Sequence, residues 1–176
     1  MQLQPVVAYQ TLVANATSVG YTVFMKTVPS QQTETAWVLL IRVQQVLLGQ
    51  VEAALKDAGM PPLSWYDVLL ELSRNSGAGL RQYEIGERVL LNKHNLSRLI
   101  DRMESDGLVK RQACEIDGRG NIVKITGKGA QLKQEMWPVY AKTIQELIAE
   151  PLTATQVRSL TDIMNALLEK HMVKVL

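Results

Sequence analysis

The chain has 176 residues, a formal net charge of +2 and a hydrophobic content of 47%. These values predict one domain with helical additions and a packed core, and they exclude wholesale disorder. No apolar run approaches the roughly 18–20 residues of a membrane span. One cysteine excludes an intrachain disulfide and, with two histidines, makes a poor structural zinc site. We therefore predict a cytoplasmic protein without metal, cofactor or membrane partner.

The first 24 residues carry no charged side chain, and residues 1–33 are interpreted as an N-terminal extension. Ala14-Asn15-Ala16 is similar to the cleavage site of an export signal, but no basic region precedes it and polar residues interrupt the apolar stretch. Two alternatives are an upstream start codon, with Met25 as the native first residue, and a segment that docks on a partner subunit.

Apolar residues recur at spacings of three and four from Glu34 to about Lys56, which predicts an amphipathic helix of about six turns. The stripe contains Trp37, Leu40, Val43, Leu47, Val51 and Ala54. Leu39, Val46 and Leu55 widen it beyond one face. A helix this long and apolar needs two packing partners, and one of them can be another chain.

A second helix is predicted from Trp65 to about Arg74. Ser64 is expected to be its N-cap, with Asp67 at the capping-box position and Leu63 and Val68 as a hydrophobic staple. A shorter helix follows from about Arg81 to Val89.

Asn92 is predicted to cap the next helix, which runs from Lys93 to about Ser105 and ends at Asp106-Gly107. Its inward face is predicted to contain Leu96, Leu99, Ile100 and Met103. The remaining surface is polar and basic, mostly in the first two turns, and carries Lys93, His94, Asn95, Ser97, Arg98 and Arg102. This helix therefore presents small polar and basic side chains at its N-terminal end.

A β-hairpin is predicted next, with strands at residues 108–116 and 122–125 and turn residues between them. A long helix from Thr126 to about Glu150 follows, and Pro138 is expected to kink it by removing a helical hydrogen bond. Thr153 and Gln156 form a predicted capping box for the last helix. The apolar stripe of that helix contains Val157, Leu160, Ile163, Met164, Leu167 and Met172.

This order of elements is a winged helix-turn-helix arrangement, mainly α with a small β wing. In such folds the second helix of the pair presents its N-terminal residues to base edges in the major groove. Asn, Ser and His can hydrogen-bond base edges, while Arg and Lys reach guanine or phosphate. Residues 92–128 hold eight basic and five acidic residues, a net +3 against +2 for the chain, so a local basic patch is present.

The hairpin tip carries Arg119 between two glycines. An arginine on a thin wing can enter a narrow minor groove, where the negative potential is enhanced. Asp117 is expected to hold the guanidinium of Arg119, or that of a neighbouring basic residue such as Arg111. Lys124 adds a basic residue on the return strand. The alternative is a plain surface hairpin with a solvated arginine.

These residues resemble the MarR family of winged-helix transcriptional regulators from about residue 34 to residue 170. The wing signature of that family, DxRxxxVxLT followed by Gly, is matched here by Asp117, Arg119, Val123, Ile125, Thr126 and Gly129, with Ile for Leu. The resemblance implies a domain at 34–172, with a DNA-binding lobe at about 64–128 and dimerisation helices at about 34–57 and 127–172. It further implies a homodimer that represses from a pseudo-palindromic operator on double-stranded DNA and is released by small anionic phenolics or oxidants.

A small aromatic effector would be expected near the aromatic residues of the long helices and an adjacent basic residue. The candidate pocket residues are Trp37, Arg42, Trp65, Tyr66, Trp137 and Tyr140. Aromatic residues at helical spacing are also ordinary core, so this alternative stays open. Cys114 raises a second alternative, a redox-responsive regulator, which would need an exposed thiol with a lowered pKa.

The competing classes are an enzyme and a winged helix used only for protein contact. The sequence has no nucleophile elbow, phosphate loop, HExxH motif or paired histidine-carboxylate motif, so we predict no catalytic residues. A salt titration of binding to duplex DNA separates a DNA reader from a protein-contact module.

Overall fold

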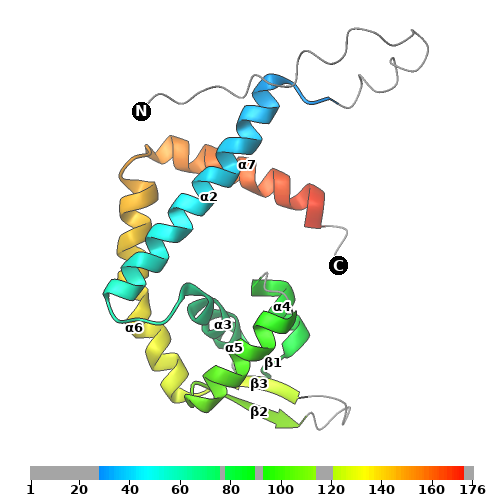
Figure 1. Ribbon diagram of the computed structural model, residues 1–176, viewed down its shortest axis with the longest axis vertical. Helices are drawn as coiled ribbons and strands as arrows, with labels where there is room; N and C mark the ends of the chain where they lie inside the picture. The colour runs from blue at the N-terminus through cyan, green and yellow to red at the C-terminus, as the bar shows by residue number, and fades with distance from the viewer. Residues whose placement is uncertain (1–27, 76–77, 90–92, 114–120, 173–176) are drawn as a thin grey trace, which may run out of the picture. The chain divides into compact units, whose positions relative to one another are not determined.

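The structure, a computed structural model, describes residues 28–75, 78–89, 93–113 and 121–172. In chain order the elements are α2 (Gln31–Asp57), α3 (Leu63–Arg74), β1 (Leu80–Arg81), α4 (Gln82–Val89), α5 (Lys93–Ser105), β2 (Val109–Ala113), β3 (Asn121–Ile125), α6 (Gly127–Ile144), the π-helical stretch η2 (Gln145–Ala149) and α7 (Ala154–Met172) (Figure 1). The predicted class, mainly α with a small β wing, is confirmed. The chain divides into two compact units, residues 1–44 and 45–176.

In the first unit, the described residues form the N-terminal half of α2. The helix begins at Gln31, earlier than the predicted Glu34, because Ser30 provides a cap. The Ser30 hydroxyl accepts from the Thr33 backbone N–H at 3.2 Å. The side chains of this half are exposed, apart from the half-buried Leu40, and Trp37 is 64% exposed.

The start of α3 differs from the prediction. Helix α3 begins at Leu63, with Pro62 at the N-cap position and no side-chain cap bond, so Ser64 lies inside the helix and is not its cap. The Leu63 backbone N–H instead donates to a carboxylate oxygen of Glu52 in α2 at 3.2 Å. A long-range contact therefore performs the role that the sequence assigned to a local one.

The sheet has three antiparallel strands in the order β1-β3-β2. Strand β1 was not predicted, because two residues are too few to show an alternating pattern. Leu80 pairs with Val123 of β3 in this strand. The two longer strands pair over five residues, from Val109 opposite Ile125 to Ala113 opposite Asn121, and lie side by side as the wing (Figure 1).

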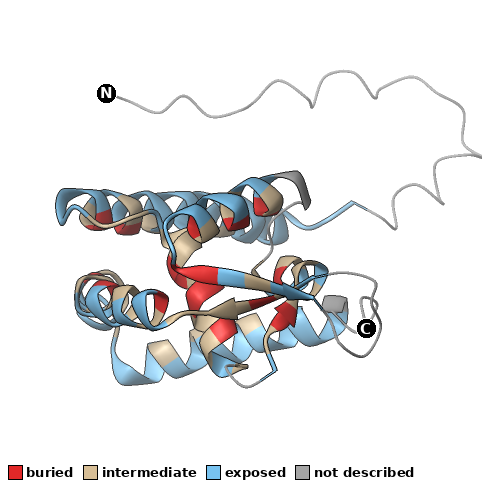
Figure 2. Cartoon of the chain, turned by 90° about the horizontal axis from the view of Figure 1, so that it is seen from below, coloured by how far each residue is buried: buried red, intermediate tan, exposed pale blue. Residues whose placement is uncertain are grey.

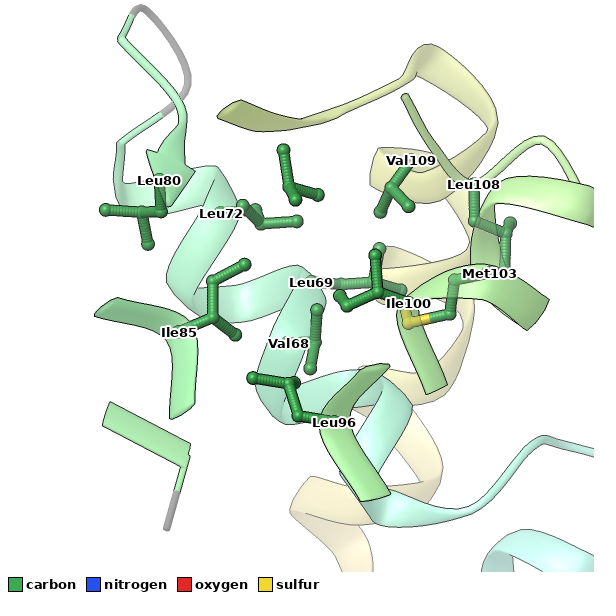
Figure 3. Close-up of a cluster of buried hydrophobic side chains, with 11 residues drawn as sticks. Val68, Leu69, Leu72, Leu80, Ile85, Leu96, Ile100, Met103, Leu108 and Val109 are labelled. Atoms are coloured by element: carbon green, nitrogen blue, oxygen red, sulfur yellow. The ribbon is translucent and has the colours of Figure 1, made fainter. Parts of the chain in front are cut away.

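The main hydrophobic core is built by the segment from α3 to β3, which we call the winged lobe. Its buried members are Val68, Leu69, Leu72, Leu80, Ile85, Leu96, Ile100, Met103, Leu108, Val109 and Val123 (Figure 3). They come from α3, α4, α5, from all three strands and from the turn before β2. The predicted inward residues of α5 belong to this core, with Leu99 packed at its edge.

A second, smaller core joins the C-terminal half of α2 to α3 and α6. Val51, Leu55, Tyr66 and Met136 are its buried members. Val51 and Leu55 are the buried residues of α2. The rest of its predicted stripe is only partly covered, with Leu40, Leu47 and Ala54 half-buried and Trp37 and Val43 exposed.

The last helix, α7, begins at the predicted capping box. Pro138 lies inside α6, and the π-helical stretch η2 continues the segment to Ala149. The capping box of α7 is confirmed, because the Thr153 N–H donates to Gln156 Oε1 at 2.8 Å and the Gln156 N–H donates back to Thr153 Oγ1 at 3.3 Å. No side chain of α7 from Ala154 to Lys170 is buried. Pale blue exposed stretches run along much of the long helices in Figure 2.

By length and average composition, α2 is apolar enough to cross a membrane, although it contains no apolar run of the length that the sequence analysis looked for. The sequence has no unbroken apolar run there, because Arg42, Gln44 and Gln45 interrupt it, but its average hydropathy is high. A soluble helix with an apolar face passes the same test, so this property alone carries no argument for a membrane.

Candidate nucleic-acid interface

The candidate recognition helix is α5, the second helix of the α4–α5 pair. Its amphipathic pattern is confirmed, because Leu96 and Ile100 are buried while Asn95, Arg98 and Arg102 are exposed. Ser97 is half-buried. Lys93 and His94 begin the helix, but their side chains lie outside the described part of the structure.

The end of α5 is closed as predicted. Gly107 has a φ of 71°, in the left-handed region that favours glycine. The Leu108 N–H donates to the Met103 carbonyl at 2.8 Å, and the Gly107 N–H donates to the Glu104 carbonyl at 2.9 Å. Strand β2 therefore leaves α5 after a connection of only three residues.

The wing strands place two lysines directly opposite each other. Lys110 of β2 pairs in register with Lys124 of β3, whereas the flanking pairs turn the buried Val109 and Val123 toward the core. Like charges in directly opposed positions destabilise a strand pair. Lys110 was absent from the predicted contacts, although the period-two alternation of a strand could have identified it as a partner of Lys124.

The tip of the wing lies outside the described residues, and with it Asp117, Arg119 and Cys114. The expected contacts of Asp117 and Arg119 therefore stay predictions, and so does the state of the Cys114 thiol.

Arg111 joins the wing to the recognition helix. Its guanidinium donates to Asp101 Oδ1 at 2.5 Å and to Glu104 Oε2, and its backbone N–H donates to Glu104 Oε1 at 2.8 Å. Two carboxylates of α5 therefore hold this guanidinium. The pairing of Asp117 with Arg111 stays a prediction, because Asp117 lies outside the described residues. The hydrogen bond from the backbone N–H of Arg111 is the main cause that lowers the pKa of Glu104, and the hydrogen bond from the Arg111 guanidinium lowers it further.

The wing also connects tightly to α6. Thr126 is the N-cap of α6, and its hydroxyl accepts a hydrogen bond from the Gly129 N–H at 3.1 Å. The same hydroxyl donates a hydrogen bond to the Gly107 carbonyl at 2.8 Å. A Cβ on Gly129 would lie only 2.1 Å from the Leu108 carbonyl oxygen. Two signature residues, Thr126 and Gly129, therefore serve this junction by capping and by close backbone approach.

The predicted effector residues fall into separate groups. Tyr66, Trp137 and Tyr140 contact one another, with ring centroids 5.2 to 6.2 Å apart. Trp65 packs against the main core and lines a different feature, a cavity of about 410 Å³. That cavity is also lined by Pro61, Asp106, Leu108, Lys128, Gln131, Leu132 and Glu135. Trp37 and Arg42 belong to the first unit, where both are exposed.

Beside the aromatic group, Asp67 is half-buried on α3. Burial raises its pKa, and the nearby charges of Glu52 and Glu71 raise it further. Burial likewise raises the pKa of Tyr66 and Tyr140, with the charge of Asp67 as a further cause. No group of three or more His, Cys, Asp or Glu side chains in the described ranges could hold a metal ion.

The helix pair, the short β1 strand and the two-stranded wing define a winged helix-turn-helix protein. A sequence model described as MarR family matches residues 58–120, so the predicted resemblance to this family of transcriptional regulators is confirmed. The similar regulators are not enzymes, so the enzyme alternative is set aside.

Similar proteins agree with this assignment. The chain is 26% identical over 113 residues to the HTH-type transcriptional regulator MhqR of Bacillus subtilis (strain 168), covering 64% of this chain and 76% of the relative. The structure of Sco3205 from Streptomyces coelicolor, a MarR family regulator in complex with DNA, is 26% identical with a TM-score of 0.73, covering 81% and 93% of the two chains. AbsC from the same organism is 24% identical with a TM-score of 0.72, covering 81% and 96%, and shares the fold.

Proposed function

We propose that the protein is a sequence-specific DNA-binding repressor in the cytoplasm, which binds a pseudo-palindromic operator as a homodimer. The observation that carries the proposal is the pair of basic surfaces on adjacent elements, the exposed Arg98 and Arg102 of α5 and the opposed Lys110 and Lys124 of the wing. A polyanion would be attracted by both basic surfaces. The DNA complex of the similar Sco3205 supports the same reading.

Uncovered apolar side chains on α2 and α7 support the homodimer. On α7, Ile163, Leu167 and Leu168 are 56%, 45% and 52% exposed. On α2, Val43 and Val46 are each more than half exposed. Contiguous apolar surface on a soluble protein marks an interaction site, and a second copy of the chain supplies a self-complementary partner.

The test is to select a binding site from a random duplex library and then to titrate binding against salt. We expect Arg98→Ala and Asn95→Ala to weaken cognate binding by about 1–3 kcal/mol while changing binding to random duplex little, because both side chains read bases. Arg119→Ala should weaken binding to most sequences. Equal losses on cognate and random duplex for both α5 variants would contradict base reading. Binding to no duplex at all would favour the protein-contact alternative.

A small aromatic acid is the proposed effector, and the cavity beside Trp65 is its proposed site. The volume of about 410 Å³ suits such a molecule. The Lys128 ammonium donates to the Asp106 carbonyl at 2.8 Å and has further N–H donors for a ligand carboxylate, whereas the Asp106 and Glu135 carboxylates of the lining oppose an anion. The cavity adjoins the α5–β2 turn and α6, so a ligand with different affinity for two positions of these elements would shift operator binding.

The effector proposal is tested by operator binding in the presence of salicylate, with Trp65→Leu as the cavity variant. We expect salicylate to lower operator affinity of the wild type and to have less effect on the variant. Release by peroxide that disappears in Cys114→Ser would instead support the redox alternative.

A further inference from the structure

We propose that Arg111 is a positioning residue for DNA binding, which fixes the wing against the recognition helix rather than contacting phosphate itself. This inference rests on the proposed function above. Its starting point is that both acceptors of the guanidinium, Asp101 and Glu104, lie on α5, while Arg111 itself lies in β2.

The contacts form a clamp with several points of attachment. Glu104 receives the backbone N–H of Arg111 on one oxygen and the guanidinium on the other, and Asp101 receives the second guanidinium nitrogen. A planar guanidinium presents its donors in a fixed fork, so it can satisfy two carboxylates only in a narrow range of orientations. Together with the short turn at Gly107, the clamp fixes the angle at which β2 leaves α5.

The register of the wing separates Arg111 from the lysines. Lys110 and Arg111 are neighbours in β2, so their side chains point to opposite faces of the sheet. Arg111 is opposite the buried Val123, on the face toward the core, and its side chain is only 21% exposed. Lys110 is exposed on the other face, opposite Lys124.

This geometry gives Arg111 a defined task. A winged helix reads DNA by placing the recognition helix in one groove and the wing in the next, so both must be held at one mutual angle. Arg111 also cancels carboxylate charge on the helix that approaches the phosphates. Loss of the clamp would spread the wing over several angles and would weaken the cognate site more than random DNA, which needs no such alignment.

The variants Glu104→Gln, Arg111→Lys and Lys110→Ala separate positioning from phosphate contact. Affinities for the selected site and for random duplex are measured over a range of salt, with urea unfolding to establish that each variant is folded. Glu104→Gln removes a negative charge and frees part of Arg111, so a phosphate-contacting Arg111 would make every duplex bind more tightly. Positioning predicts the opposite sign, a loss of at least about fivefold at the cognate site with little change on random duplex.

Arg111→Lys keeps the charge but loses the fork, so we expect it also to weaken cognate binding. Lys110→Ala is the matched control, and it should weaken both duplexes and lower the salt slope by about one. Wild-type affinity in Arg111→Lys, or tighter binding in Glu104→Gln, would overturn the inference while leaving the proposed function intact. A wild-type chain that bound no duplex would overturn both.

Discussion

The winged lobe and the long helix α7 differ in where their apolar side chains lie. Leu69 and Ile100 of the lobe are completely buried, within a core supplied by the lobe itself. Leu168 of α7 has a similar apolar character but is 52% exposed. The lobe therefore forms its core within one chain, whereas no side chain of α7 from Ala154 to Lys170 is buried by the described chain. The proposed homodimer would supply that cover.

The largest expected effect contrasts the two regions with two substitutions. Leu69→Ala should lower the free energy of unfolding by about 2–5 kcal/mol, because it opens a cavity in the closed core. Leu168→Glu keeps a good helix former but places a charge on the uncovered face, so it should convert the proposed dimer to a monomer in light scattering. If α7 simply faced solvent, Leu168→Glu would leave the mass unchanged and alter stability by less than about 0.5 kcal/mol.

A second contrast lies at the junction of the wing with α6. Gly129→Ala should lower the free energy of unfolding by about 1–3 kcal/mol, because its Cβ would clash with the Leu108 carbonyl. Gly127→Ala is the control two residues away, where nothing lies within 4 Å of an added Cβ. The control should be neutral or stabilising by up to about 1 kcal/mol. Equal effects of the two substitutions in urea unfolding would contradict the close approach.

The smallest effect concerns the carboxyl group of Asp67, which is half-buried on α3. Because the pKa of Asp67 is raised in the folded state, ionisation of this carboxyl costs stability at neutral pH. Asp67→Asn should therefore unfold at higher urea than the wild type at pH 7. This advantage should shrink as the pH falls through the raised pKa, and it should vanish below the ordinary value of 3.8, where the carboxyl is protonated in both states. A variant less stable than wild type at pH 7 would show that the carboxylate has a favourable partner.

The sequence alone predicted the elements that local interactions determine. The two faces of α5, the left-handed stop at Gly107 and the Thr153–Gln156 box all depend on residues three or four positions apart, and the structure confirms them. The wing strands followed from turn residues and alternation, and the signature pointed to the family whose model matches residues 58–120. The order of the elements was therefore accessible before any tertiary contact was known.

Only the tertiary structure decided features that depend on residues distant in sequence. Glu52 satisfies the first N–H of α3 from eleven residues away, so the local cap at Ser64 was a wrong prediction. Strand β1 exists because β3 pairs with it, and Arg111 finds its carboxylates on α5, seven and ten residues before it. Such pairings are chosen by the packing of the whole lobe, which brings together donors and acceptors that no local periodicity connects.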